Sequence, residues 1–169
     1  MRAGIALGSN LGNRLAHLRE GRKRLLALHD GSGPFLCSKI YETAPVDCPA
    51  GSLPFLNAAI ELSTQLPPLD LLVDLQRIEI DSGRQAVHPF HGPRTLDLDF
   101  LYLGDVRMSH SSLKLPHPEM LQRFFVIKPL ADICPERVVP CAGLSVRELC
   151  EKFESRELSA EQSKVVSFF

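Results

Sequence analysis

The stretch that decides the fold reads Gly92-Pro93-Arg94-Thr95-Leu96-Asp97-Leu98-Asp99-Phe100-Leu101 and continues apolar to residue 103. Residues 95–103 are typical of a β-strand, and alternate side chains of a strand share a face. Asp97 and Asp99 therefore point to one side. The apolar residues between and beside them point to the other side, and these are Leu96, Leu98 and Phe100. The pattern predicts a strand with an apolar core side and an acidic side.

Outward from this strand, turn-forming residues divide the chain into further strands and helices. We expect strands over residues 5–7, 35–42 and 55–62, with the last two antiparallel. We expect one helix after an N-cap at Asn13 and a second that starts at Pro67-Pro68. A short helix within 116–130, interrupted by Pro129, and a helix over 146–153 are expected to follow. The order strand, helix, strand, strand, helix, strand predicts an α+β, ferredoxin-like sandwich, in which a mainly antiparallel sheet has helices packed on one face.

Composition limits the classes of protein to which the chain can belong. Its 169 residues are predicted to form one domain, residues 1–169, with 44% apolar and 23% charged residues. The net charge of −1 favours neither nucleic acid nor an anionic membrane as a partner. Five cysteines without a C-x-x-C pair indicate reduced thiols, and no apolar run approaches membrane-spanning length. We therefore expect a cytoplasmic protein and, since nothing indicates an obligate oligomer, a monomer.

The two aspartates are the strongest chemical signal. Two carboxylates on one strand face repel each other and need a cation, and Mg²⁺ is often held by one or two carboxylates together with substrate phosphates. Arg94, directly upstream, is suited to neutralising a phosphate. A solvated acidic face is the alternative interpretation of a bare D-x-D pattern, but the glycine, proline and arginine before it favour the metal.

Arg84 follows a helix that ends at Gly83, where a cation also compensates the helix dipole. Beside Arg94 and the aspartates it becomes a second candidate phosphate ligand. Phosphoryl transfer depends mostly on positioning and charge neutralisation, so arginines and metal suffice without a protein nucleophile.

A second group of residues suits a flat heterocycle. Asn57 offers a donor and an acceptor to a mixed ring edge, and Phe55 can stack on a ring face. A core phenylalanine and a turn asparagine are the ordinary alternatives, and the same caution applies to Phe124 and Phe125. His88 and His91 lack a convincing third ligand for a zinc site.

Several separate motifs, in order from about residue 5 to residue 136, resemble the 6-hydroxymethyl-7,8-dihydropterin pyrophosphokinase family. The matching segments are 6–12, 41–46, 55–59, 76–79, 83–84, 92–99, 115–118, 129–130 and 135–136. The resemblance implies transfer of a diphosphate group from ATP to the hydroxymethyl group of a reduced pterin, with release of AMP, before dihydropteroate synthesis in the folate pathway. Small molecules, ATP and pterin, would be its partners.

The resemblance also implies roles for individual residues. Asp97 and Asp99 would bind two Mg²⁺ ions, while Arg84 and Arg94 would stabilise the charge that develops during transfer. The pterin would be held by Thr43, Ala44, Val46, Phe55, Asn57 and Phe125. ATP would be met by Gln76, His117 and Arg123.

The chain departs from the family pattern in one loop. Residues 85–91 lack the basic residues that often close over the nucleotide, and only histidines there can carry positive charge. This loop is the support for one alternative, a relative that binds pterin without transfer activity. A separate alternative is a non-catalytic binding module on a ferredoxin-like sheet, for example for RNA. An RNA-binding sheet would display exposed aromatics among basic residues, whereas this strand displays paired aspartates.

Overall fold

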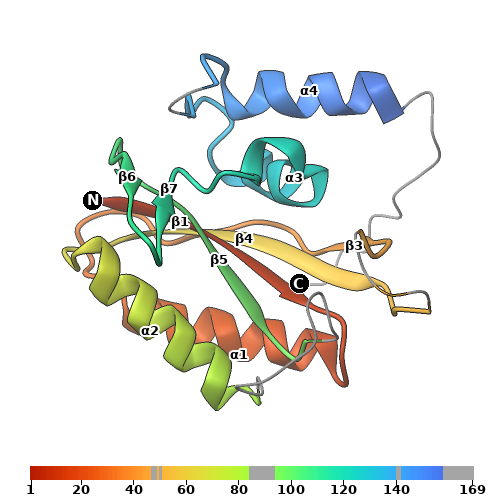
Figure 1. Cartoon of the computed structure of the whole chain (residues 1–169), viewed down its shortest axis with the longest axis horizontal. Helices are drawn as coiled ribbons and strands as arrows, with labels where there is room; N and C mark the ends of the chain where they lie inside the picture. The colour runs from red at the N-terminus through yellow and green to blue at the C-terminus, as the bar shows by residue number, and fades with distance from the viewer. Residues whose placement is uncertain (47–48, 50, 84–93, 140–141, 158–169) are drawn as a thin grey trace.

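The computed structural model of the chain describes residues 1–46, 49, 51–83, 94–139 and 142–157. A five-stranded antiparallel sheet lies at its centre (Figure 1). Its strands are β1 (Arg2–Ser9), β2 (Leu36–Cys37), β3 (Tyr41–Thr43), β4 (Phe55–Ser63) and β5 (Asp97–Leu103). The order is β2-β4-β1-β5, and β3 also pairs with β4, so β1 lies between the two other long strands. The predicted α+β class and mainly antiparallel sheet are confirmed.

Two glycines of β1 face the same side of the sheet and mark two rows of residues across it. Gly8 pairs with Asn57 of β4 and with Asp97 of β5. Gly4 pairs with Glu61 of β4 and Tyr102 of β5. The register of β1 against β5 shifts between Gly4 and Ile5, because β5 carries one extra residue there, as in a β-bulge.

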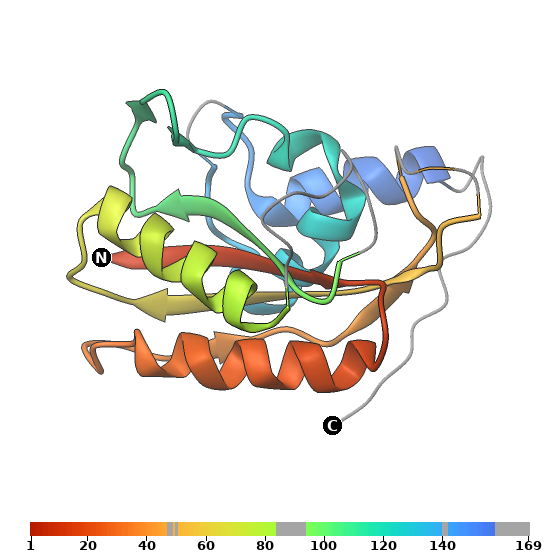
Figure 2. The ribbon, with the colours of Figure 1, turned by 60° about the horizontal axis from the view of Figure 1, so that its bottom comes forward.

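Helices α1 (Arg14–Ala27) and α2 (Pro68–Asp81) cover one face of the sheet (Figure 2). The side chain of Asn13 accepts a hydrogen bond from the Ala16 amide at 3.1 Å, which confirms the predicted N-cap. The largest hydrophobic cluster fills this layer. It includes Ile5, Leu7, Leu25, Leu62, Leu71, Leu75, Leu96, Leu98 and Phe100.

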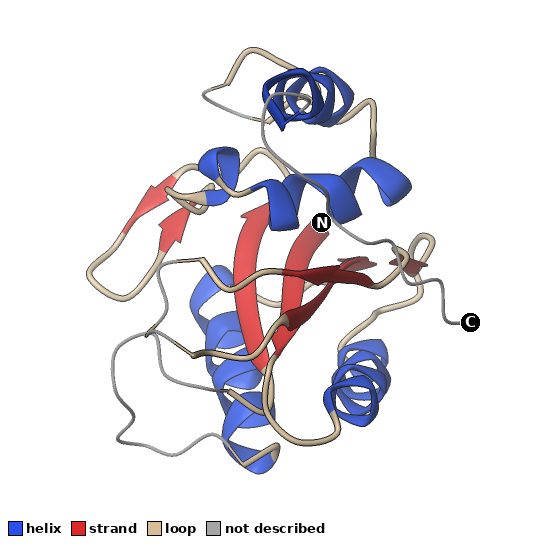
Figure 3. Ribbon diagram, turned by 90° about the vertical axis from the view of Figure 1, so that its right-hand side faces the viewer, coloured by secondary structure: helices blue, strands red, loops and turns tan. Residues whose placement is uncertain are grey.

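The opposite face is covered by α3 (Phe124–Ile133), and α4 (Val146–Glu157) packs on the outer side of α3 (Figures 1 and 3). The expectation of helices on one face only was therefore wrong. The central strands are buried along both faces, and side chains such as Ala59 and Leu101 need a second apolar layer above them. Pro129 lies inside α3 and does not end it, since the helix continues to Ile133.

Two further differences from the sequence prediction are local. The strand expected over 35–42 is divided into β2 and β3. Between them, the Ser38 hydroxyl accepts a hydrogen bond from the Ala59 amide at 2.8 Å, and the Lys39 amide donates to the Asp132 carboxylate at 3.0 Å instead of to a neighbouring strand. After β5, a small hairpin of β6 (Met108–Ser109) and β7 (Lys114–Leu115) leads to the 3-10 helix η1 (Met120–Gln122).

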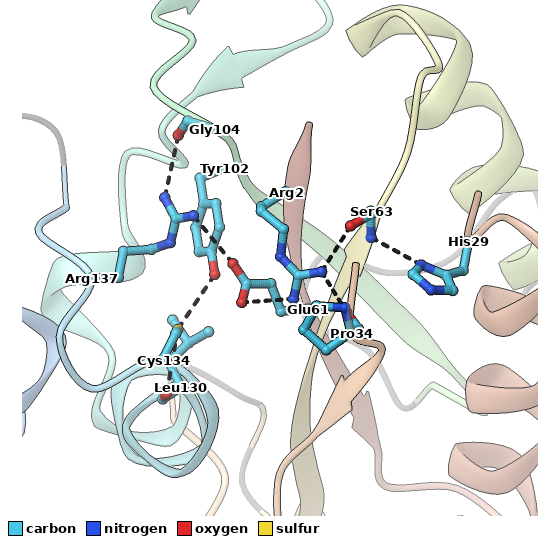
Figure 4. A network of polar contacts seen from close by, with 10 residues as sticks. All are labelled: Arg2, His29, Pro34, Glu61, Ser63, Tyr102, Gly104, Leu130, Cys134 and Arg137. Atoms are coloured by element: carbon cyan, nitrogen blue, oxygen red, sulfur yellow. Dashed lines mark hydrogen bonds and ion pairs between the residues drawn. The ribbon is translucent and has the colours of Figure 1, made fainter. Parts of the chain in front are cut away.

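A polar network occupies the row around Gly4 (Figure 4). The buried carboxylate of Glu61 lies 3.1 Å from Arg2 and 3.2 Å from Arg137. The Arg137 guanidinium also lies over the Tyr102 ring, 4.2 Å from its centroid. A Cβ atom on Gly4 would approach this ring to 2.3 Å, so the glycine leaves the space that the tyrosine fills.

No helix in the described ranges is long and apolar enough to cross a membrane.

Candidate active site

A polar cleft of about 370 Å³ opens where α2, the beginning of β5 and the segment around η1 meet. It brings together six of the residues predicted to handle ATP and metal. The lining consists of Leu72, Gln76, Glu79, Arg94, Asp97, Leu98, Asp99, His117, Glu119 and Arg123. Residues from positions 72 to 123 thus form one surface, as their predicted common role requires.

Asp97 and Asp99 lie on the same face of β5, as the alternation predicted, and Leu98 between them is buried in the opposite layer. Arg94 forms an ion pair with Asp97, and Arg123 Nη1 lies 3.6 Å from Asp99 Oδ2. Burial, together with repulsion from Asp97, raises the pKa of Asp99 above its ordinary value, although His117, Arg123 and Arg94 oppose the shift. The site therefore disfavours two ionised carboxylates unless a cation joins them.

These carboxylates fit Mg²⁺, which takes oxygen ligands and commonly uses one or two carboxylates with substrate phosphates. Within the described ranges, no cluster of three or more histidine, cysteine or acidic side chains forms a complete protein cage for a metal. An ion held by these two carboxylates would leave coordination positions for substrate phosphates, as is common in phosphoryl transfer.

Arg94 is held by its backbone. Asn10, only 2% exposed, accepts the Arg94 amide on its side chain at 2.7 Å and donates its own amide to the Arg94 carbonyl at 3.1 Å. The Nε atom of Arg94 is buried and has no hydrogen-bond partner among the described residues, which suits an anionic ligand. Sequence reasoning assigned no role to Asn10. The signal that could have found it is an amide residue between glycines in the loop after β1.

Glu79 is a further residue to which sequence reasoning assigned no role. It is 5% exposed, and its Oε1 accepts the Leu98 amide at 2.8 Å, so it holds the peptide between the two aspartates. Leu72, Gln76 and Glu79 are spaced i, i+4, i+7 along α2 and line the cleft together. This helical spacing was the available signal.

His117 and Arg123 form the wall opposite α2. The Glu119 amide donates to His117 Nδ1 at 3.2 Å, which assigns the proton of the neutral ring to Nε2. Arg123 forms an ion pair with Glu119, and its guanidinium lies 5.7 Å from the centroid of the Phe125 ring. Arg123 thus connects the acidic side of β5 with the aromatic side chain predicted to stack on pterin.

The predicted pterin residues gather beside Gly8. A Cβ atom on Gly8 would lie 3.3 Å from Asn57 Oδ1, 3.7 Å from Phe55 Cδ1 and 3.9 Å from Asp97 Cβ. Asn57 is 6% exposed and donates its amide to Thr43 Oγ1 at 2.7 Å. The side-chain gap at Gly8 therefore adjoins a ring, an amide and one of the paired carboxylates.

Other predicted residues are not brought to this group. Ala44 and Val46 lie in the loop after β3 and are exposed, Val46 at 54%. Arg84 and the histidine-containing loop 85–91 lie outside the described residues. Arg14 contacts both ends of the loop that carries Val46. Its guanidinium lies 2.8 Å from the Glu42 carboxylate and donates to the Pro54 carbonyl at 2.7 Å.

Comparison with known proteins agrees with this arrangement. Residues 4–135 match the model of the family described as 7,8-dihydro-6-hydroxymethylpterin-pyrophosphokinase (HPPK). The chain is 42% identical over 132 residues to 2-amino-4-hydroxy-6-hydroxymethyldihydropteridine pyrophosphokinase from Bacillus subtilis, with 78% of this chain and 77% of that protein covered. It is 38% identical over 157 residues to the folic acid synthesis protein fol1 from Pneumocystis carinii, covering 91% of this chain.

Some relatives are much longer. The chain spans 20% of the Pneumocystis carinii protein. The crystal structure of Plasmodium falciparum HPPK-DHPS with pteroate has the same fold, with a TM-score of 0.71 at 17% identity, and the match covers 94% of this chain and 43% of that one. The family match over most of the chain and the identity to the Bacillus subtilis enzyme together show that this chain belongs to the 7,8-dihydro-6-hydroxymethylpterin-pyrophosphokinase family.

Proposed function

We propose that the chain transfers the diphosphate group of ATP to the hydroxymethyl group of 6-hydroxymethyl-7,8-dihydropterin, giving AMP and the pterin diphosphate ester for folate biosynthesis. The reaction class follows from membership of the pyrophosphokinase family. One observation carries its assignment to a site: Asn57, Gly8 and Asp97 stand side by side on three strands, so a group that reads a ring edge adjoins the acidic pair.

The residues divide the work between the two substrates. Phe55 and Phe125 stack on the faces of the pterin ring, while Asn57 and the backbone at Thr43, Ala44 and Val46 read its edge. Gln76, His117 and Arg123 bind ATP from the walls of the cleft. The half-buried cleft excludes much of the water that would screen these contacts, which strengthens them.

Transfer forms one P–O bond, breaks another and releases the hydroxyl proton. The hydroxyl oxygen of the pterin forms a bond to the β-phosphorus and loses its proton to solvent, while the bond from that phosphorus to the α-phosphate oxygen breaks and AMP departs with that oxygen. Arg94 and Arg123 leave their carboxylate partners and neutralise the phosphate oxygens, and Arg84 joins them. Positioned positive charge of this kind stabilises the transition state without a covalent intermediate.

Asp97 and Asp99 are the ligands that we assign to Mg²⁺, two ions in all. Asp97 and Asp99 would hold the metal beside the transferred group, where its positive charge would offset the negative charge of the phosphates. Glu79 and Asn10 keep the two aspartates and Arg94 in place through the backbone hydrogen bonds described above.

The test is release of AMP from Mg-ATP with and without 6-hydroxymethyl-7,8-dihydropterin, with ADP measured in the same samples. AMP that appears only with pterin, without ADP, is the expected result. Absence of both nucleotides, although pterin binds, would instead identify a pterin-binding relative without transfer activity.

We also propose that the chain acts as a single domain and a monomer in the cytoplasm, with ATP and the pterin as its partners and without binding nucleic acid. Net charge near neutrality and the acidic face of β5 support the proposal that the chain does not bind nucleic acid. Light scattering and a filter-binding assay with single-stranded RNA at physiological salt test the two points.

A further inference from the structure

A buried tyrosine connects the sheet to α3 close to the proposed pterin site. Tyr41, on β3, is 5% exposed, and its hydroxyl donates to both carboxylate oxygens of Asp132, at 3.0 and 2.9 Å. Asp132 also accepts the Lys39 amide at 3.0 Å. One carboxylate at the end of α3 therefore holds β3 and the backbone two residues before it.

Both ends of this connection lead to residues proposed to contact pterin. On the sheet, Tyr41 pairs directly with Asn57 and lies two residues before Thr43. On the helix, Asp132 follows Phe125 by seven residues. Seven residues are close to two turns of an α-helix, so the two side chains leave the same face of α3, about 10 Å apart along its axis.

The helix between these two residues has one weak point. Pro129 has no amide hydrogen, so the hydrogen bond that would return to the carbonyl of Phe125 is missing from α3. The first turn, which carries Phe125, is thus joined to the rest of α3 by one hydrogen bond fewer. At the far end of the helix, Tyr41 and Lys39 fix Asp132 to the sheet.

We propose that Tyr41 is a positioning residue, which sets the separation between Phe125 on α3 and the Asn57–Phe55 wall on β4 and thereby controls affinity for the pterin but not for ATP. The inference rests on the proposed function, because it takes the aromatic pair as the two sides of a ring-binding slot. Burial and the hydrogen bond to Asp132 raise the pKa of the Tyr41 hydroxyl, so the hydroxyl remains a donor at neutral pH and the contact persists.

The test compares two substitutions that each remove one buried hydroxyl. Tyr41→Phe removes the contact with Asp132. Tyr102→Phe removes a similarly buried hydroxyl that lies 3.4 Å from Cys134 Sγ, beyond the end of α3 and in the row of Gly4, away from the cleft. Both variants lose a link between sheet and helix, so a purely structural effect appears in both.

Direct binding of pterin and of a non-hydrolysable ATP analogue is measured by titration calorimetry, with kcat and both KM values from AMP release. Tyr41→Phe is expected to weaken pterin binding about tenfold, the change that corresponds to about 1.4 kcal/mol, with ATP-analogue binding within about twofold of wild type. Tyr102→Phe is expected to leave both affinities unchanged. Asp132→Asn, at an exposed position, is expected to weaken pterin binding in the same direction but less, because one oxygen remains.

Unchanged pterin affinity in Tyr41→Phe overturns the inference, and so does an equal loss in Tyr102→Phe or an equal loss for both ligands. A wild-type protein that binds no pterin overturns the proposed function and this inference with it. A wild type that binds pterin but releases no AMP overturns the proposed transfer alone, because the binding comparison still decides the role of Tyr41.

Discussion

Replacement of Gly8 by alanine isolates the contribution of the sheet surface to pterin binding. The added Cβ atom would meet Asn57 Oδ1 at 3.3 Å, Phe55 Cδ1 at 3.7 Å and Asp97 Cβ at 3.9 Å. The last two distances are ordinary van der Waals contacts, and the first needs Asn57 to move by only a few tenths of an ångström. Loss of glycine in a strand interior favours the folded state by about 0.5–1 kcal/mol, and the shift required of the buried, hydrogen-bonded Asn57 offsets that gain, so we expect the variant to fold.

The bound pterin has no such freedom. The gap over Gly8 adjoins Asn57 and Phe55, two residues proposed to hold the pterin, and we therefore place the ring over Gly8. The methyl carbon raises the surface there by roughly 1.5 Å, one carbon–carbon bond length. A displacement of about 1 Å from the reactive position lowers the rate on the order of 100-fold. We expect kcat/KM for the pterin to fall by about this factor in Gly8→Ala, while the affinity for the ATP analogue stays within about twofold of wild type.

The matched control is Gly4→Ala, four residues earlier on the same strand and the same face. Its Cβ would reach the Tyr102 ring at 2.3 Å, which the packed core cannot accept without rearrangement. We expect this variant to lose about 1–3 kcal/mol of stability but to keep its pterin kcat/KM when folded. The assays are AMP release at varied pterin and thermal denaturation. Gly8→Ala with wild-type pterin kcat/KM, or with equal losses for both substrates, would refute the placement of the ring over Gly8.

The remaining predictions concern the carboxylates and the network around Glu61. Asp97→Ala should abolish AMP release at saturating Mg²⁺ but leave the circular dichroism spectrum unchanged, and retention of wild-type activity at any Mg²⁺ concentration would refute its role as a metal ligand. Asp99→Asn should raise the melting temperature of the ligand-free protein at neutral pH. The pKa of Asp99 is raised on folding, so protonated Asp99 stabilises the fold at low pH. That stability is lost as the pH rises through the folded pKa. The difference in melting temperature between Asp99→Asn and wild type should therefore shrink as the pH falls. A variant less stable than wild type at neutral pH would contradict this cause. Arg137→Met should lower the free energy of unfolding by about 1.5–3 kcal/mol, because a charged hydrogen bond to Glu61 is lost while Arg2 remains, and denaturant titration tests it. AMP release per folded molecule should stay unchanged, since the network lies in the row of Gly4 and not of Gly8.

Local sequence patterns predicted the two faces of β5 and the start of α1. The alternation around Asp97 and Asp99 assigned the two faces of β5 correctly, and Asn13 was correctly identified as the cap of α1. The family resemblance is confirmed as well. The roles given to individual site residues remain predictions, although six of them line one cleft.

Contacts between distant segments could not be predicted in the same way. Asn10 holds Arg94 across 84 positions, and Tyr41 meets Asp132 across 91, and neither pair leaves a periodic signal. Helices near α3 and α4 were expected, but their position on the opposite side of the sheet was not, because a strand buried on both faces has no alternation to indicate which side its helices cover. Glu79 was missed for a different reason, since a glutamate near a helix end is usually solvated.

The position of β1 at the centre of the sheet has a consequence for folding during synthesis on the ribosome. This strand pairs Ala3 with Leu103, so the central sheet cannot close until a segment about 100 residues downstream has been made. At typical translation rates of about 5–20 residues per second, the edge of β1 that pairs with β5 waits roughly 5–20 s for its partner. Its other partner, β4, is made about halfway through that interval, so β1 has only α1 to pack against at first, and chaperones have their best opportunity to bind the nascent chain then.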